Sequence, residues 1–267
     1  MFKKLIFGLC LWLFATTLSF GANLQDGVNA IEKGDYKTAF TIFEDLASKG
    51  DAKAQYNLGV MYRDGEGVRQ DYKKAFEWYE KAATQGVVDA QYNLGVMYYN
   101  GKGVKQDYKK AIEWYEKAAT QGFAKAQYNL GVMYERGQGV KQDYKKAIEW
   151  YEKAANQGIA EAQYNLGLMY DNGQGVRQDY KKAIEWWEKA AKQGYANAQF
   201  NLGAVYGNGE GVRQDYKKAK EWFGKACDGG YQKGCDNYKI LNQQGVLKNY
   251  SFLIHSQFKY WECTYLY

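Results

Sequence analysis

A 36-residue period runs through the chain and constrains its fold more than any other feature. The hexapeptide Ala-Gln-Tyr-Asn-Leu-Gly begins at Ala54 and returns three times at that step, followed by Ala-Gln-Phe-Asn-Leu-Gly from Ala198. The pentapeptide Asp-Tyr-Lys-Lys-Ala recurs in the same register. Self-similarity at such a period is typical of architectures in which each unit stacks on its neighbours. Full units are predicted at 52–87, 88–123, 124–159, 160–195 and 196–231.

Each unit is predicted to contain two helices. In the second helix of the first unit, Asp71 is a suitable N-cap and Gly86 a suitable stop. Between them apolar residues such as Ala75 and Tyr79 recur at steps of three and four, which gives the helix one apolar face. The corresponding stripe of the first helix comprises Ala54, Leu58, Met61 and Tyr62.

One such helix pair cannot bury its own apolar face, so the pairs are expected to stack. Gly59 lies beside the stripe, where a missing side chain lets another helix approach closely. We therefore predict an all-α fold, an α-solenoid of stacked antiparallel helix pairs with about 13 helices, over residues 22–245. A partial unit at 24–51 caps one end, and a final helix within 232–245 caps the other.

The first 21 residues are predicted to be a secretory signal and not part of the fold. Lys3 and Lys4 precede an apolar stretch, residues 5–18, that is shorter than the ~20 residues a membrane-spanning helix needs. Small residues around Gly21 favour cleavage there, and an uncleaved anchor is the alternative. We expect a secreted or periplasmic protein with no membrane span after signal cleavage.

Charge and residue usage exclude several classes of function. The formal net charge is +6, of which Lys3 and Lys4 contribute two, so the positive charge left on the repeats is too dilute for nucleic-acid binding. Between Lys49 and Tyr250 there is no Ser and no His, which excludes a Ser–His–Asp triad within the repeats. Since His255 is the single His, we expect no metal site, and nothing in the sequence indicates a cofactor.

One short motif lies in an aromatic-rich tail, residues 246–267, which does not continue the repeat. Ser256-Gln257-Phe258-Lys259 reads S-x-x-K, the nucleophile motif of serine β-lactamases. The companion motifs S-D-N and K-T-G are absent, so a chance match is the better explanation. The sequence therefore assigns no catalytic residue.

The repeated motifs resemble the Sel-one-like repeat family, which is related to the tetratricopeptide repeat. The resemblance lies in Ala-x-x-x-Leu-Gly-x-x-Tyr, Gly-x-Gly-Val, Asp-x-x-x-Ala and Ala-Ala-x-x-Gly, and it covers about residues 24–245. Within that family the last unit is similar to the Helicobacter cysteine-rich proteins, whose repeats carry two Cys eight residues apart. Here Cys227 and Cys235 have that spacing, and the other units carry Ala and Gln at those positions.

The cysteine pair is predicted to be structural. Cys227 ends one helix and Cys235 starts the next, so a disulfide between them would staple the final turn. Metal binding by the pair lacks further ligands. Cys263 is left over, either as a free thiol or for an intermolecular bridge.

The resemblance implies two different functions. Some Sel-one-like proteins are adaptors that hold partner proteins, which favours a scaffold that binds a protein or peptide. The cysteine-rich group is described as penicillin-binding with β-lactamase activity, so a weak β-lactam-binding hydrolase is the alternative. A β-lactam or a cell-wall peptide is then a possible ligand.

The first helices carry the candidate binding residues. A row of Tyr is predicted on the face opposite the buried stripe, which is the concave side in stacked helix pairs, and a position that varies between units follows at the end of the helix. Tyr supplies contact area with little loss of entropy, which suits peptide recognition. The alternative is that part of the row packs against the next unit. The Tyr row comprises Tyr56, Tyr92, Tyr128 and Tyr164, and the varying position holds Arg63, Tyr99, Glu135 and Asp171.

Overall fold

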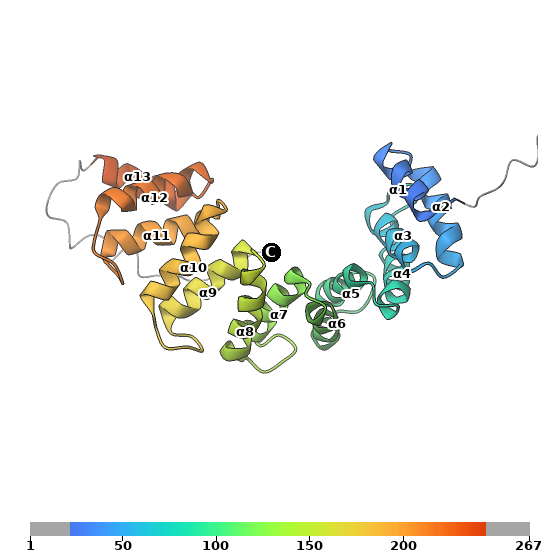
Figure 1. Cartoon of the computed structure of the whole chain (residues 1–267), viewed down its shortest axis with the longest axis horizontal. Helices are drawn as coiled ribbons and strands as arrows, with labels where there is room; N and C mark the ends of the chain where they lie inside the picture. The colour runs from blue at the N-terminus through green and yellow to red at the C-terminus, as the bar shows by residue number, and fades with distance from the viewer. Residues whose placement is uncertain (1–21, 244–267) are drawn as a thin grey trace, which may run out of the picture. The chain divides into compact units, whose positions relative to one another are not determined.

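The computed structural model describes residues 22–243, and these form thirteen α-helices and no strand. The predicted all-helical architecture of stacked 36-residue pairs is confirmed. The helices, labelled in Figure 1, fall into two compact bodies that divide after Asp107. Below, the first unit and the second unit mean these two bodies, and the 36-residue segments are called repeats. The first unit contains α1 Leu24–Glu32, α2 Tyr36–Ser48, α3 Ala52–Asp64, α4 Tyr72–Thr84 and α5 Val88–Asn100. The second contains α6 Tyr108–Thr120, α7 Ala124–Arg136, α8 Tyr144–Asn156, α9 Ala160–Asn172, α10 Tyr180–Lys192, α11 Ala196–Asn208, α12 Tyr216–Asp228 and α13 Gln232–Gln243.

The ends of the helices are where the capping residues predict them. The carboxylate of Asp71 accepts hydrogen bonds from the backbone N–H groups of Lys73 and Lys74 at 3.0 and 3.1 Å, so α4 begins at Tyr72. Gly86 adopts φ +91°, a left-handed conformation that a side chain disfavours, directly after the α4 C-cap. The same residue types recur in each repeat, which explains why the helix boundaries follow the sequence period.

In the first unit each helix packs on the next one along the chain. Phe43, Leu58 and Met61 form the centre of the core there and are almost fully buried. The predicted close approach at Gly59 is confirmed, because a Cβ built on this residue would lie 2.5 Å from the ring of Tyr79. A glycine at this position thus lets the aromatic side chain of α4 lie directly on the backbone of α3.

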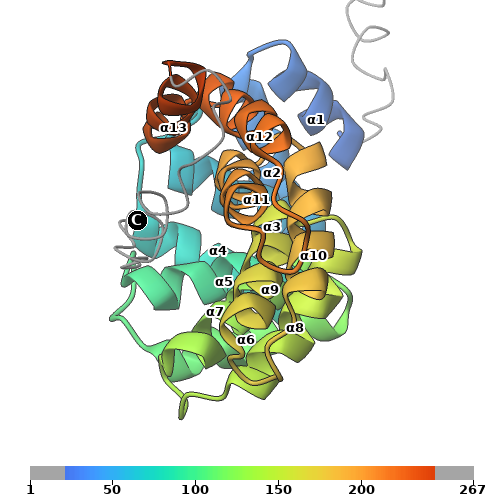
Figure 2. The ribbon, with the colours of Figure 1, turned by 90° about the vertical axis from the view of Figure 1, so that its left-hand side faces the viewer.

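The second unit repeats this packing over eight helices. One core cluster joins Tyr151 of α8 to Leu166 and Met169 of α9, and the next joins Trp187 of α10 to Leu202 of α11. Each cluster therefore takes side chains from two successive repeats, as stacking of incomplete hairpins requires. Figure 2 turns this unit toward the viewer, with α12 and α13 side by side at its end.

A buried glutamine fastens each repeat to the one before it. Its side-chain Nε2 donates a hydrogen bond to the backbone carbonyl oxygen of the alanine eight residues earlier, as from Gln55 to Ala47 at 3.3 Å. A buried amide with a satisfied donor fixes the turn between helix pairs. We call these residues the junction glutamines: Gln55, Gln91, Gln127, Gln163 and Gln199.

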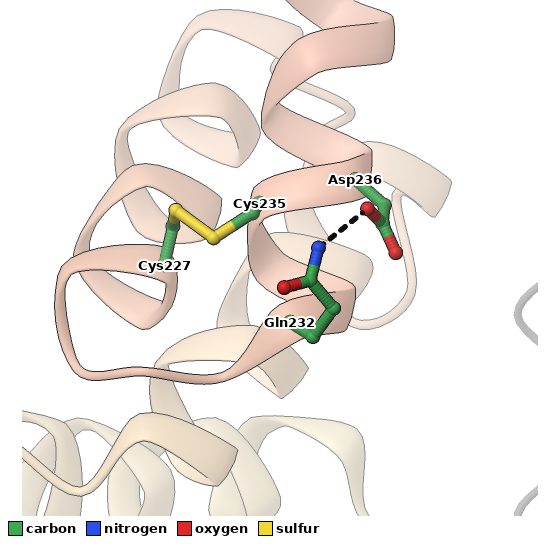
Figure 3. Close-up of a disulfide and its surroundings, with 4 residues drawn as sticks. All are labelled: Cys227, Gln232, Cys235 and Asp236. Carbon is green, nitrogen blue, oxygen red and sulfur yellow. Dashed lines mark hydrogen bonds between the residues drawn. A yellow bond between two sulfur atoms is a disulfide. The ribbon is translucent and has the colours of Figure 1, made fainter.

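The last turn is fastened by a covalent bond instead. Cys227 near the end of α12 and Cys235 in α13 form a disulfide, with Cα atoms 4.5 Å apart (Figure 3). In the same view Gln232 donates a hydrogen bond to Asp236 at 3.0 Å within the first turns of α13. The disulfide therefore ties the terminal helix to the repeat that precedes it.

Candidate peptide-binding site

The residue that varies at the end of each first helix lies beside the tip of the aromatic ring buried by the second helix. In the second unit the hydroxyl of Tyr151 donates a hydrogen bond to the carboxylate of Glu135. In the first unit burial raises the pKa of Tyr79, and the positive charge of the nearby Arg63 opposes that rise. In these two repeats the residue at the varying position therefore interacts with a buried tyrosine of the core.

The row of Tyr does not lie wholly on the face away from the core, as the sequence predicted. Tyr164 is only 5% exposed and belongs to a core cluster with Leu202 and Val205 of the next repeat, and its ring centroid lies 5.2 Å from that of Tyr195, the N-cap residue of α11. The prediction is wrong for this residue, and the alternative of packing against the next repeat holds. The reason is that a first helix in a stack is covered from two sides, by its own partner and by the following repeat.

The other members of the row are partly buried. Tyr56 packs on Tyr79, and Tyr128 packs on Tyr151, each with ring centroids 5.8 Å apart. Burial raises the pKa of Tyr128 to about 12. Tyr92 is half-buried on α5. These rings thus cover the core aromatics and present only an edge to solvent.

The carboxylates at the varying position of the second unit are held in partly apolar surroundings. Burial raises the pKa of Glu135, and its hydrogen bond from Tyr151 opposes that rise. Burial also raises the pKa of Asp171 to about 6, with a further contribution from the negative charge of Glu210. Asp171 and Glu210, which belong to successive repeats, therefore lie close enough to repel each other.

A cavity opens in the first unit where α3, the linker that follows it, α4 and α5 meet. Its volume is about 360 Å³. Of the candidate residues named from the sequence, this cavity is lined by Arg63, whereas Tyr56, Tyr92 and Tyr99 do not line it. The lining comprises Arg63, Asp64, Gln70, Tyr72, Tyr79, Asn93, Val96, Met97, Asn100 and Lys102.

Most of these lining residues were not identified from the sequence, because they differ little from the equivalent residues of the other repeats. Lys102 had a signal that was available: the equivalent linker positions hold Glu66, Gln138, Gln174 and Glu210, so this is the one Lys among them. Asn93 and Met97 had none, since their equivalents are nearly the same in every repeat.

One residue of the cavity lining, Tyr79, carries a buried hydroxyl. Tyr79 has no exposed surface, and its hydroxyl makes no well-formed hydrogen bond to any residue that the structure describes. Burial raises the pKa of Tyr79 well above its ordinary range, and the nearby Arg63 opposes that rise. A buried hydroxyl of this kind is costly, and it offers no surface to a molecule in the cavity.

Two basic side chains line the cavity. Arg63 makes a forked ion pair with Asp64, with Nε and a terminal nitrogen 2.7 and 2.6 Å from the two carboxylate oxygens. This hydrogen bonding raises the pKa of Arg63 further. Lys102 lies over the ring of Tyr72, with Nζ 5.5 Å from the ring centroid, and its side chain is exposed. Both walls of the cavity therefore carry positive charge.

Several residues named in the sequence analysis lie beyond residue 243, the last that the structure describes. Ser256, Lys259 and Cys263 lie outside the described residues, so the S-x-x-K motif and the β-lactamase alternative stay predictions. Among residues 22–243 no group of three or more His, Cys, Asp or Glu is placed to hold a metal ion. In the same part of the chain no helix is both long and apolar enough to cross a bilayer.

Comparison with known proteins identifies the repeat. A family model described as the Sel1 repeat matches residues 52–87, 88–123, 124–159, 160–195 and 196–231. No curated protein sequence matches the chain.

Solved structures give the same fold. A protective antigen of uropathogenic Escherichia coli strains with an SLR fold is 36% identical, with a TM-score of 0.80, over 84% of this chain and 49% of its own. A Sel1 repeat protein from Oxalobacter formigenes is 32% identical, with a TM-score of 0.75, over 85% of this chain and 91% of its own. Helicobacter pylori cysteine rich protein B is 26% identical, with a TM-score of 0.36, over 53% of this chain and 96% of its own.

The present chain thus spans about half the length of the E. coli antigen and most of the Oxalobacter protein. The chain belongs to the Sel1 repeat family.

Proposed function

We propose that the chain is a scaffold that binds a segment of a protein or peptide partner, and that the cavity of the first unit is a docking point. The observation that carries this proposal is a cavity of about 360 Å³ whose lining combines apolar Val96 and Met97 with the cationic side chains of Arg63 and Lys102.

The make-up of the cavity suits one side chain and its flanking backbone. Its volume of about 360 Å³ is at the lower end of the range for ligand pockets. Val96 and Met97 supply apolar wall, while Asn93 supplies an amide that can both donate and accept hydrogen bonds. Apolar walls with a few placed polar groups are typical of sites that bind and orient a ligand.

The experiment is a selection of binding peptides on the full chain from random synthetic libraries, followed by affinity measurements on the peptides obtained. Replacing Asn100 by Trp should fill the cavity mouth and weaken binding of the selected peptides at least about tenfold. Asn172→Trp is the matched control, because Asn172 is the exposed equivalent of Asn100 in the second unit. Equal affinities of the two variants for every selected peptide would remove the cavity from the proposal.

We also propose that the protein is exported. The predicted signal at residues 1–21 supports this, and so does the disulfide between Cys227 and Cys235, because structural disulfides persist mainly in oxidising compartments. Expression in a bacterial host with a periplasm, followed by intact mass measurement, tests the proposal. We expect loss of the first 21 residues and no reaction of these two cysteines with an alkylating reagent. A chain that keeps Met1 and carries alkylated Cys227 and Cys235 would contradict it.

A further inference from the structure

We infer that the cavity of the first unit selects a carboxylate group of its partner, and that Arg63 and Lys102 determine this specificity. The inference rests on the proposed function, since it names the chemistry of the partner group that enters the cavity. The carboxylate belongs either to an Asp or Glu side chain or to the end of a peptide chain, and the test below separates these sources.

Charged hydrogen-bond donors outnumber charged acceptors in the cavity lining. A guanidinium has five N–H donors, and Asp64 occupies one on Nε and one on a terminal nitrogen of Arg63. The Nζ of Lys102 adds further donors. Because Asp64 is the one carboxylate in the lining and is already paired, the cavity keeps one net positive charge. A carboxylate offers a negative charge and charged acceptors that match these donors.

The same pair of positions carries the opposite charge three repeats later. The equivalents of Arg63 and Lys102 are Asp171 and Glu210, which lie in the second unit. There the negative charge of Glu210 acts on Asp171, which places the two side chains near each other across one repeat junction. The backbone of the repeat thus brings these two positions together, and the sequence sets the sign of the charge that they share.

The two intervening repeat junctions carry at most one charged residue at this pair of positions. Tyr99 is combined with Gln138, and Glu135 with Gln174. Only the first junction therefore combines two basic residues, among the four junctions for which both positions exist. Unequal residues at otherwise uniform positions indicate that this pair is not needed for stacking, because the other repeats stack without it.

Full-length wild-type protein and the variant R63D/K102E, which copies the acidic pair of the second unit, are compared by selection from random peptide libraries with free and with amidated C termini. Wild type should enrich acidic residues or free C termini. Replacing a selected Asp or Glu by its amide, or amidating the C terminus, should weaken binding at least about tenfold. The change that weakens binding identifies the source of the carboxylate. The variant should lose these peptides to a similar extent.

Two further variants keep the test decisive if R63D/K102E does not fold. K102E changes only an exposed side chain, and K105E makes the same charge change at an exposed linker residue outside the cavity. K102E should weaken binding of acidic peptides several-fold more than K105E. Peptides that bind equally well with Gln in place of Glu and with an amidated terminus would overturn the inference and leave the proposed function standing. If neither library yields a binder, both fail.

Discussion

The side chain of Gln163 donates a hydrogen bond of 3.0 Å from Nε2 to the carbonyl oxygen of Ala155, eight residues earlier in the chain. Two repeats later the same positions hold Cys235 and Cys227, and the hydrogen bond is replaced by a disulfide. The two fastenings are thus alternatives at one structural position. Among the described residues, the covalent bond occurs at the last of these turns, between α12 and α13.

This equivalence predicts the effect of removing the disulfide. C227A/C235A should lower the free energy of unfolding by about 2 kcal/mol, because closure of a short loop no longer restricts the unfolded chain. C227A/C235Q restores the residue pair of the other junctions and should recover about 1 kcal/mol of that loss through the amide hydrogen bond. Urea denaturation of both variants measures the difference. Identical midpoints for the two variants would show that the pair at this turn is not interchangeable.

The contact between α3 and α4 predicts a second effect. Gly59→Ala places a Cβ 2.5 Å from the ring of Tyr79, so we expect a loss of about 1–3 kcal/mol from overpacking. Gly207→Ala is the matched control, because its Cβ would lie 3.8 Å from the nearest atom, an ordinary contact. That variant should gain up to about 1 kcal/mol, since Ala favours a helix over Gly. Thermal melts of both proteins give the comparison.

The hydroxyl of Tyr151 predicts a third. A fully exposed Tyr row would let Tyr128→Ala with Glu135→Lys leave stability nearly intact, but both residues contact Tyr151. We expect this double variant to lose at least about 3 kcal/mol, through lost ring packing and a buried hydroxyl without its acceptor. Glu135→Gln keeps an acceptor and should cost less than about 1 kcal/mol. A double variant that melts within a degree or two of wild type would mean that the second unit repacks around Tyr151.

The carboxyl of Asp171 predicts a dependence on pH. Burial raises its pKa in the folded protein to about 6, above the ordinary value of 3.8, so the folded state binds the proton more tightly than the unfolded chain does. The folded state is therefore penalised above about pH 6, and the penalty disappears as the pH falls toward 4. Asp171→Asn should stabilise the protein by about 1–2 kcal/mol at pH 7 and by much less at pH 4.

Denaturation at both pH values measures this difference. Glu149→Gln, at an exposed position, controls for the substitution of a carboxylate by an amide. The prediction fails if Asp171→Asn gains as much at pH 4 as at pH 7.

The fold was accessible from the sequence because its determinants are local and repeated. Asp71, Gly59 and Gly86 each fix a cap, a close approach or a stop within one repeat, and the period carries them to the next. The candidate site was not accessible in this way. The cavity combines Arg63 and Lys102 from successive repeats, and their proximity depends on the stacking geometry. Tyr164 was misplaced for the same reason, since it is buried in a cluster with Leu202 and Val205 of the following repeat.

The disulfide also sets the size of the smallest piece that can open at the end of the second unit. A terminal helix held by side-chain contacts alone can detach by itself, because local unfolding follows the fewest buried contacts. Since Cys235 lies in the first turns of α13 and is bonded to Cys227, those turns cannot leave without the end of α12. The cooperative element at this end is thus a hairpin, and amide protons of α12 and of the start of α13 should exchange together while the last turns of α13 exchange sooner.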